Sequence, residues 1–216
     1  MSNKITELVF ILDASGSMHG LEQDTIGGVN AILEEQKKTQ NGDTVYVSTV
    51  IFNNDSRVVH DRVGLETVEL MTEKSYVVGG CTALYDAVGG AIKHIANIHK
   101  YARKEDVPER TLFVIMTDGM ENASRRYEQR QIKEMIDGQQ KKGWEFIFLA
   151  ANIDACDAAV DLGIAPERAV DWNADGESVR MMYCCVNECV NTVRERKAYS
   201  RELFAEADEE FEKKKQ

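Results

Sequence analysis

The sequence predicts an α/β fold: a mostly parallel, six-stranded sheet between two layers of helices, in a three-layer αβα, Rossmann-like arrangement with one antiparallel edge strand. Short apolar segments alternate along the chain with longer segments of helical period, and such alternation predicts a mainly parallel sheet that is covered on both faces. Residues 8–12 (LVFIL) are an unbroken apolar run, which is typical of a strand buried on both faces.

Six segments have the composition of strands. Most are apolar runs, and the second is rich in β-branched residues, which favour strands. The third alternates apolar and polar residues after a hairpin-type turn at 53–56, as an antiparallel edge strand does. The predicted strands are residues 7–13, 44–52, 57–63, 111–117, 145–151 and 168–172.

Five segments have helical period. The first should bury one face, because apolar residues recur on it every three or four positions. The last is expected to start at Asp175, a residue type that often caps helices, and to bury a similar face. The predicted helices are residues 20–39, 82–101, 126–141, 154–162 and a final helix from Asp175. The expected buried faces are Leu21, Thr25, Val29, Ile32, Leu33 and Gln36 in the first helix, and Val179, Met182, Tyr183, Val186, Val190 and Val193 in the last.

The composition is that of a globular protein with one main domain, since the chain has 216 residues, 43% hydrophobic and 29% charged. The net charge of −11 argues against nucleic acid and anionic membrane surfaces, which attract clustered Lys and Arg. No apolar stretch approaches the roughly 20 residues of a membrane helix, and no signal peptide is recognised. Five cysteines without framework spacing indicate reduced thiols. We therefore expect a cytoplasmic protein.

The most informative motif is Asp13-Ala14-Ser15-Gly16-Ser17, directly after the first predicted strand. It places a carboxylate and two hydroxyls at the carboxyl end of a core strand, and these oxygen donors suit a hard divalent cation such as Mg²⁺. Ser and Asp are also common in turns and helix caps, so the motif alone is equally compatible with a turn.

Two further segments favour the cation site. Thr82 follows Gly79-Gly80-Cys81 and opens a helical segment, and Asp118 follows the strand that ends at Thr117. In parallel sheets ligands bind beyond the carboxyl ends of the strands, where the strand order reverses. Polar residues on loops at that edge therefore indicate a binding site.

The combination of Asp-x-Ser-x-Ser, a Thr and an Asp resembles the metal-ion-dependent adhesion site of von Willebrand factor type A domains, over about residues 4–195. The segments 117–124 (TDGMENAS) and 143–149 (GWEFIFL) resemble small intracellular bacterial proteins of this type. The resemblance implies that the first and fourth strands are neighbours and that Asp13 and Asp118 face one another. It also implies a final helix that shifts when an acidic ligand engages the metal. The implied metal ligands are Asp13, Ser15, Ser17, Thr82 and Asp118.

The resemblance implies a metal-dependent protein-binding module. A bound Mg²⁺ (or Mn²⁺) would be neutralised by the two carboxylates, and a partner's Asp or Glu would displace one of its waters. The alternative role is a non-catalytic subunit or adaptor of an AAA+ ATPase or of a stress-resistance (tellurite-type) assembly. The phosphate loop, dinucleotide fingerprint, nucleophile elbow and His-Glu-x-x-His motif are absent from the sequence. We therefore expect no enzymatic activity, unless His19 or Glu121 acts as a base.

Several residues around the motif have alternative interpretations. His19, Asp86, Glu121 and Asn122 are expected at the rim of the site. Asp86 either favours the start of its helix or hydrogen-bonds to the metal loop. Cys185 and Cys189 could share a helix face and bind a soft metal, but buried thiols are the more common case.

The chain is expected to divide into a von Willebrand factor type A domain at residues 1–198 and a charged helical extension at 199–216. Within the extension, apolar residues recur every four positions and Glu and Lys are spaced four apart. A frayed terminus is the alternative. The recurring apolar residues are Tyr199, Leu203, Ala207 and Phe211.

Overall fold

The computed structural model describes residues 4–39, 42–151, 154–173, 175–197, 201–205 and 209. These residues form one six-stranded sheet with helices on both faces. The strands are β1 (Ile5–Asp13), β2 (Thr44–Phe52), β3 (Ser56–Gly64), β4 (Arg110–Thr117), β5 (Trp144–Ala150) and β6 (Ala169–Asp171). The helices are α1 (Glu22–Lys38), α2 (Leu84–Tyr101), α3 (Gln129–Gln140), α4 (Ala155–Asp161) and α5 (Gly176–Arg194). Short 3₁₀ turns are η1 (Gly16–Met18), η2 (Leu65–Thr67), η3 (Lys104–Asp106), η4 (Pro166–Arg168) and η5 (Arg201–Phe204).

The sheet has the strand order β3-β2-β1-β4-β5-β6. All neighbouring strands are parallel except β2 and β3, so β3 is the antiparallel edge strand that the sequence predicts. The chain leaves β1 towards β2 on one side and later returns to β4 on the other side. The strand order therefore reverses between β1 and β4, and the adjacency predicted for these two strands is confirmed.

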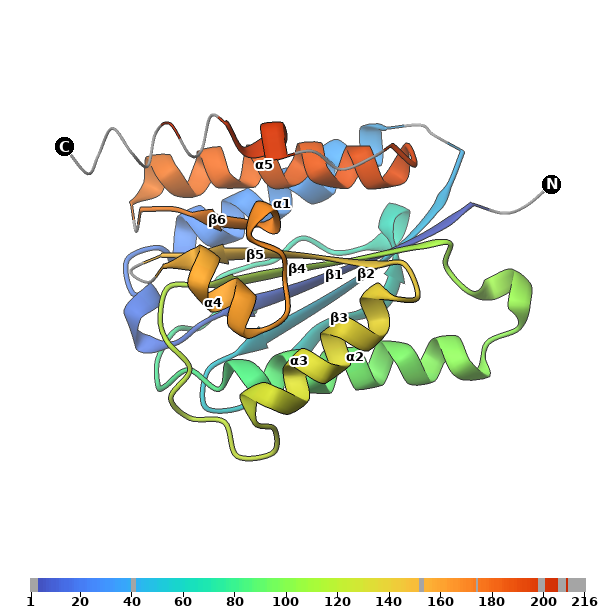
Figure 1. The fold of residues 1–216 in the computed structure, drawn as a ribbon. Coiled ribbons are helices and arrows are strands. Elements are labelled where there is room, and N and C mark those ends of the chain that lie inside the picture. Colours follow the sequence, from blue (N-terminus) through green and yellow to red (C-terminus); the bar gives the residue numbers. More distant parts are fainter. Residues whose placement is uncertain are drawn as a thin grey trace.

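The two faces of the sheet are covered by different helices, as Figure 1 shows. Helices α1 and α5 lie side by side on one face, while α2, α3 and α4 cover the other. Because successive side chains of a strand point to opposite faces, Phe10 of β1 packs under α1 and α5 and Ile11 packs under α2 and α3. Both predicted buried faces, of the first helix and of α5, lie in the core.

Helices α1 and α5 approach closely at Gly28. The ring of Tyr183 from α5 occupies the space over this glycine, and a Cβ added to Gly28 would lie 1.9 Å from the Cδ2 atom of Tyr183. The Tyr183 hydroxyl donates a hydrogen bond to Sδ of Met116 at 3.0 Å, next to the end of β4. The last helix is thus fixed both to α1 and to the strand that leads into the candidate site.

Three predicted helices start at least two residues later than expected, α1 and α2 by two residues and α3 by three. Residues 126–141 were expected to be helical, but α3 begins at Gln129. The backbone N–H groups of residues 125–127 donate to the carboxylate of Asp86 instead, and Glu128 then caps the helix together with Gln131. The tertiary contact to Asp86 outweighs the local helical period.

At the opposite end of β1, a charged cluster is buried. The Glu7 carboxylate is fully buried and accepts hydrogen bonds from Nε of Arg62 at 2.8 and 3.0 Å. Nε2 of His99 lies 3.3 Å from the same carboxylate, and the His99 ring packs edge-on against Trp144. Arg62 has a positive φ of 49°, which is uncommon for a residue with a side chain, so this contact overrides a local backbone preference.

Most of the predicted extension, including Tyr199, Ala207 and Phe211, lies outside the described residues. In its described part η5 brings Phe204 into the core beside α5, where the side chain is fully buried. No helix in the described ranges has the length and apolar character needed to cross a membrane.

Candidate metal centre

The two aspartates of the predicted site lie together at the carboxyl ends of β1 and β4. Asp13 ends β1 and Asp118 follows β4, and both side chains are buried. The Thr117 hydroxyl donates to Oδ2 of Asp13 at 2.6 Å. The Ser17 hydroxyl donates to Oδ1 of Asp118 at 2.6 Å and lies 3.1 Å from the Ser15 hydroxyl. Hydrogen bonds therefore link four of the five predicted residues in a row, from Asp13 through Ser15 and Ser17 to Asp118.

The turn after β1 is held by its own aspartate. Oδ1 of Asp13 accepts a hydrogen bond from the Ser15 N–H at 2.7 Å, which bends the chain so that both serines face the aspartates. The Gly16 N–H donates to the Gly80 carbonyl at 3.0 Å, and Met18 is fully buried beneath the turn. The short Asp-x-Ser-x-Ser segment thus has a rigid support on both sides.

Thr82 joins the site from the third loop. Its N–H donates to Oδ1 of Asn122 at 2.9 Å, and the Asn122 N–H donates to the Thr82 carbonyl at 3.0 Å. A Cβ added at Gly119 would lie 3.6 Å from the Ser17 hydroxyl and 3.7 Å from the Thr82 hydroxyl. The two hydroxyls therefore border a small space that the glycine leaves open.

Burial controls the electrostatics of this cluster. Removal from water raises the pKa of the Asp13 carboxyl above its ordinary value, although hydrogen bonds from Thr117 and Ser15 oppose this, and the charge of Asp118 raises it further. Burial also raises the pKa of Asp118, against the hydrogen bond from Ser17. Two like charges held close together out of water raise the energy of the ionised state, and a cation between them would lower it.

The donor set fits a hard divalent cation. Two carboxylates and three hydroxyls supply only oxygen ligands, which are the ligands that Mg²⁺ and Mn²⁺ take. Both oxygens of Asp13 already accept hydrogen bonds from protein groups, which fixes its orientation. Among the described residues no cluster of three His, Cys, Asp or Glu side chains is arranged for a metal, so a soft-metal site is not formed there. Cys185 and Cys189 are buried in the packing of α5.

Two of the predicted rim residues, Glu121 and Asn122, support the loops around the site. Glu121 braces a loop: its carboxylate accepts hydrogen bonds from the N–H groups of Tyr85, Ala123 and Ser124. Asn122 positions Thr82, as described above. Neither the Glu121 carboxylate nor the Asn122 amide is therefore arranged as an independent ligand or base.

Asp86 also has a structural role, but a different one from either expectation. Its carboxylate holds the backbone of residues 125–127. Burial raises the pKa of Asp86, but the three backbone hydrogen bonds outweigh this and lower it. His19 lies at the surface and pairs with Glu22 at 3.0 Å.

One supporting residue could not be found from the sequence. Tyr76, in the connection between β3 and α2, is buried and its hydroxyl donates to the backbone carbonyl of Asp13. The same connection donates a hydrogen bond from the Gly79 N–H to the Ala14 carbonyl at 2.8 Å. A long loop thus fixes the backbone of the metal motif, and no local pattern marks Tyr76 for this role.

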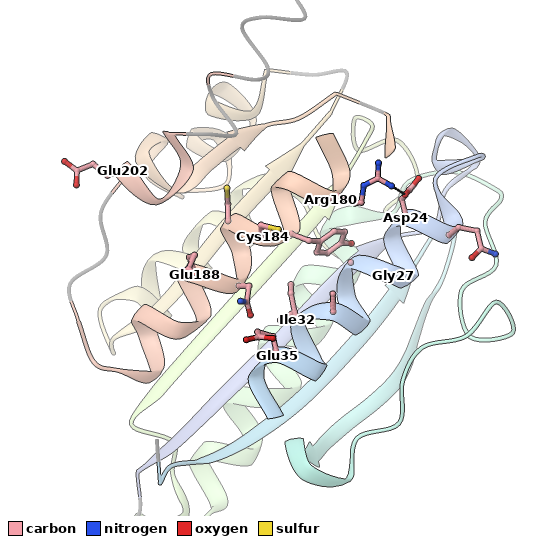
Figure 2. Close-up of a pocket in the computed structure, with 14 residues that line it drawn as sticks. Asp24, Gly27, Ile32, Glu35, Arg180, Cys184, Glu188 and Glu202 are labelled. Carbon is pink, nitrogen blue, oxygen red and sulfur yellow. Dashed lines mark ion pairs between the residues drawn. The ribbon is translucent and has the colours of Figure 1, made fainter. Parts of the chain in front are cut away.

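A separate groove lies between α1 and α5, with a cavity volume of about 930 Å³. Figure 2 shows Gly27 and Ile32 of α1 and Cys184 of α5 along it, with the ion pair between Asp24 and Arg180 (3.6 Å) at one end. None of the five candidate metal ligands lines this groove. It is a feature of the α1–α5 face and not part of the candidate metal centre.

No protein-family model matches the chain. The fold is similar to the von Willebrand factor domain of the type V pili tip protein Mfa5 from Porphyromonas gingivalis, with a TM-score of 0.66, 10% identity and coverage of 93% of this chain and 99% of that one. The chain has the von Willebrand factor type A fold. This similarity, together with the strand order, bears out the fold class that the sequence predicts.

Two other structures with the von Willebrand factor type A fold were determined with a metal. One is proximal thread matrix protein 1 from the mussel byssus with zinc in its metal-ion-dependent adhesion site (TM-score 0.58, 13% identity, 88% of this chain and 46% of that one). The other is the manganese-loaded TRAP protein of Plasmodium vivax (TM-score 0.54, 14% identity, 83% of this chain and 72% of that one). These similarities support a divalent metal at such a site.

In sequence, the chain is 30% identical over 123 residues to inter-alpha-trypsin inhibitor heavy chain H3 from Bos taurus. The match covers 53% of this chain and only 13% of the heavy chain. The similarity therefore concerns one part of a much longer protein.

Proposed function

We propose that this chain is a metal-dependent protein-binding module. The observation that carries the proposal is the meeting of two buried carboxylates and three hydroxyls where the strand order reverses. In the proposal these groups bind one Mg²⁺ or Mn²⁺, through Asp13, Ser15, Ser17, Thr82 and Asp118. Mg²⁺ keeps some of its waters when protein ligands are few, which leaves a position for a partner.

The bound cation supplies an electrophilic centre, and the chain's own residues determine what reaches it. The two carboxylates neutralise the charge of a divalent cation and leave no excess negative charge. A further carboxylate from a partner can therefore bind to the cation, whereas the two carboxylates without a cation would repel it. The hydroxyls of Ser15, Ser17 and Thr82 add no charge. An Asp or Glu of a protein partner is the ligand that this balance favours.

We propose a binding role and no catalysis. Among the rim residues, the Glu121 carboxylate is occupied by backbone hydrogen bonds and His19 pairs with Glu22 at the surface, so neither is arranged as a general base. A cytoplasmic location remains part of the proposal. The adaptor role in an AAA+ or stress-resistance assembly is compatible with the same chemistry, because such an adaptor would use the same contact.

A four-arm capture experiment tests this function. The wild-type chain and Asp118→Asn are immobilised, and each is exposed to a cell extract in Mg²⁺ and in chelator. The proposal expects a partner that binds wild type in Mg²⁺ only and is displaced by excess acetyl-glutamate. A surface variant with the same change of charge, Asp61→Asn, should retain the partner. A partner that binds equally well in chelator, or to Asp118→Asn, would contradict the proposal.

A further inference from the structure

Two exposed apolar residues, Met120 and Val77, lie in segments that are bonded to the candidate metal centre. In the described part of the chain six large hydrophobic residues are notably exposed, and Met120 (72%) and Val77 (65%) are among the most exposed of them. Single exposed apolar residues are common on protein surfaces. The position of these two, and the way in which the backbone holds each one, sets them apart. The six are Val58, Leu70, Val77, Tyr101, Met120 and Val160.

Met120 is held between two anchors to the site. On one side, the N–H and carbonyl of Gly119 are both bonded to the hydroxyl of Thr117, which also donates to Asp13. On the other, Asn122 is bonded to both backbone groups of Thr82. The backbone on both sides of Met120 is therefore fixed, and its side chain is directed to solvent at the edge of the site.

Val77 is held in the same manner on the opposite loop. The hydroxyl of Tyr76, the preceding residue, donates to the Asp13 carbonyl, and the Gly79 N–H donates to the Ala14 carbonyl. Val77 is thus fixed beside the segment that carries Asp13. The site is bordered by one exposed apolar residue on the Thr82–Asp118 side and one on the Asp13 side.

Charge restricts the ligand further. The chain carries a net charge of −11, and the carboxylate of Glu121 lies in the loop that follows Asp118. A segment with several acidic residues would be repelled by this field, and only one of its carboxylates could reach the cation. Apolar side chains beside the partner's carboxylate are not repelled by this negative charge, and their burial against Met120 and Val77 is favourable.

We infer, on the basis of the proposed function, that the partner presents one Asp or Glu between apolar side chains, and that these pack on Met120 and Val77. The carboxylate supplies the contact to the cation. The apolar neighbours supply selectivity for this partner over other acidic surfaces. Met120 and Val77 are the specificity-determining residues of the site.

Three capped peptides test the inference: acetyl-Leu-Glu-Leu-amide, acetyl-Ser-Glu-Ser-amide and acetyl-Glu-Glu-Glu-amide. Each is titrated into the full chain in Mg²⁺ and in chelator, and Kd is measured by NMR. We expect the leucine peptide to bind about tenfold more tightly than the other two in Mg²⁺. A tenfold ratio of Kd corresponds to about 1.4 kcal/mol of binding free energy. The double variant Met120→Ser/Val77→Ser should bind the leucine peptide no better than wild type binds the serine peptide.

Tyr101→Ser is the matched control. Tyr101 is 78% exposed but ends α2, about 26 Å along the helix from the end that adjoins Thr82, so its replacement should leave all affinities unchanged. Equal wild-type affinities for the leucine and serine peptides in Mg²⁺ would overturn the inference and leave the proposed function standing. An equal loss of affinity for the leucine peptide in Tyr101→Ser would also overturn the inference and leave the proposed function standing. Peptide binding that is absent in Mg²⁺, or unchanged in chelator, would overturn both.

Discussion

Replacement of Gly28 by Ala tests how closely α1 and α5 pack. An added Cβ at Gly28 would lie 1.9 Å from Cδ2 of Tyr183 and 2.4 Å from Cγ and Cε2. Real Cβ contacts are rarely shorter than 3.4 Å, so the ring would have to move by about 1.5 Å. The ring cannot move freely, because Tyr183 is 3% exposed and its hydroxyl is bonded to Met116.

The expected magnitude follows from two opposing effects. Overpacking a well-packed core costs about 1–3 kcal/mol, occasionally more. Alanine in place of glycine gains about 1 kcal/mol in a helix interior. Gly27 offers a matched control in the same helix, because a Cβ there meets nothing within 4 Å. Gly27→Ala should therefore gain the helix-propensity contribution without any overpacking cost. Both variants gain the helical contribution, so we expect Gly28→Ala to be less stable than Gly27→Ala by the overpacking cost alone, about 1–3 kcal/mol.

Thermal unfolding provides the assay. For a domain of this size about 1 kcal/mol changes Tm by about 2–4 °C, so the two variants should differ by about 2–12 °C. Circular dichroism melts of wild type and both variants, at one protein concentration and pH, measure this directly. If Gly28→Ala melts with or above Gly27→Ala, the close contact between α1 and α5 is wrong.

Three further predictions concern the core, the pH dependence and the last helix. Phe204→Ala should lower the free energy of unfolding by about 3–5 kcal/mol, because the side chain is fully buried, whereas exposed Glu202→Ala should change it little; equal urea midpoints would contradict this. Because burial raises the pKa of Asp13 and Asp118, protons should compete with the cation at a higher pH than they do for exposed carboxylates. The rise in Tm caused by Mg²⁺ should therefore shrink as the pH is lowered from 7 towards 5, and a pH-independent rise would argue against these ligands. Hydrogen exchange across residues 176–194 should change when Mg²⁺ and an acetyl-Leu-Glu-Leu-amide ligand are added together, since α5 contacts the end of β4; unchanged protection would show that α5 is not coupled to the site.

The sequence was sufficient to predict the fold because its signals are continuous. Residues 8–12 are apolar without interruption, and that pattern occurs where both faces of a strand are buried. The alternation of residues 57–63 correctly predicted the antiparallel edge strand. These patterns reflect which side chains are buried, and burial is the property that the order of apolar and polar residues indicates most directly.

Long-range polar contacts could not be predicted in the same way. The start of α3 was placed too early because the Asp86 carboxylate, some 40 residues away in the sequence, binds the backbone at 125–127. No local pattern marks Tyr76 as the support of Asp13, or Glu7 as the partner of Arg62. Each contact is specified by tertiary geometry, which the local order of residue types does not contain.

The same distinction applies to the candidate site. The motif residues could be found because carboxylates and hydroxyls follow predicted strands, and the parallel topology brings such loops to one edge of the sheet. The roles of Glu121 and Asn122 could not be found, because they depend on which backbone groups these side chains reach. The sequence predicts a set of oxygen donors, and the structure shows which residues surround and support them.

Calorimetric titration of Mg²⁺ into wild type and Asp118→Asn is the most direct test of the central claim. Asn keeps the acceptor for the Ser17 hydroxyl and removes a buried charge, so the variant should fold at least as stably as the metal-free wild type. We expect wild type to bind one Mg²⁺ per chain and to gain about 2.7 kcal/mol of stability at a free concentration of 100 times Kd. Asp118→Asn should show neither effect, and surface Asp61→Asn should show both. Equal Mg²⁺ binding by wild type and Asp118→Asn would contradict the account.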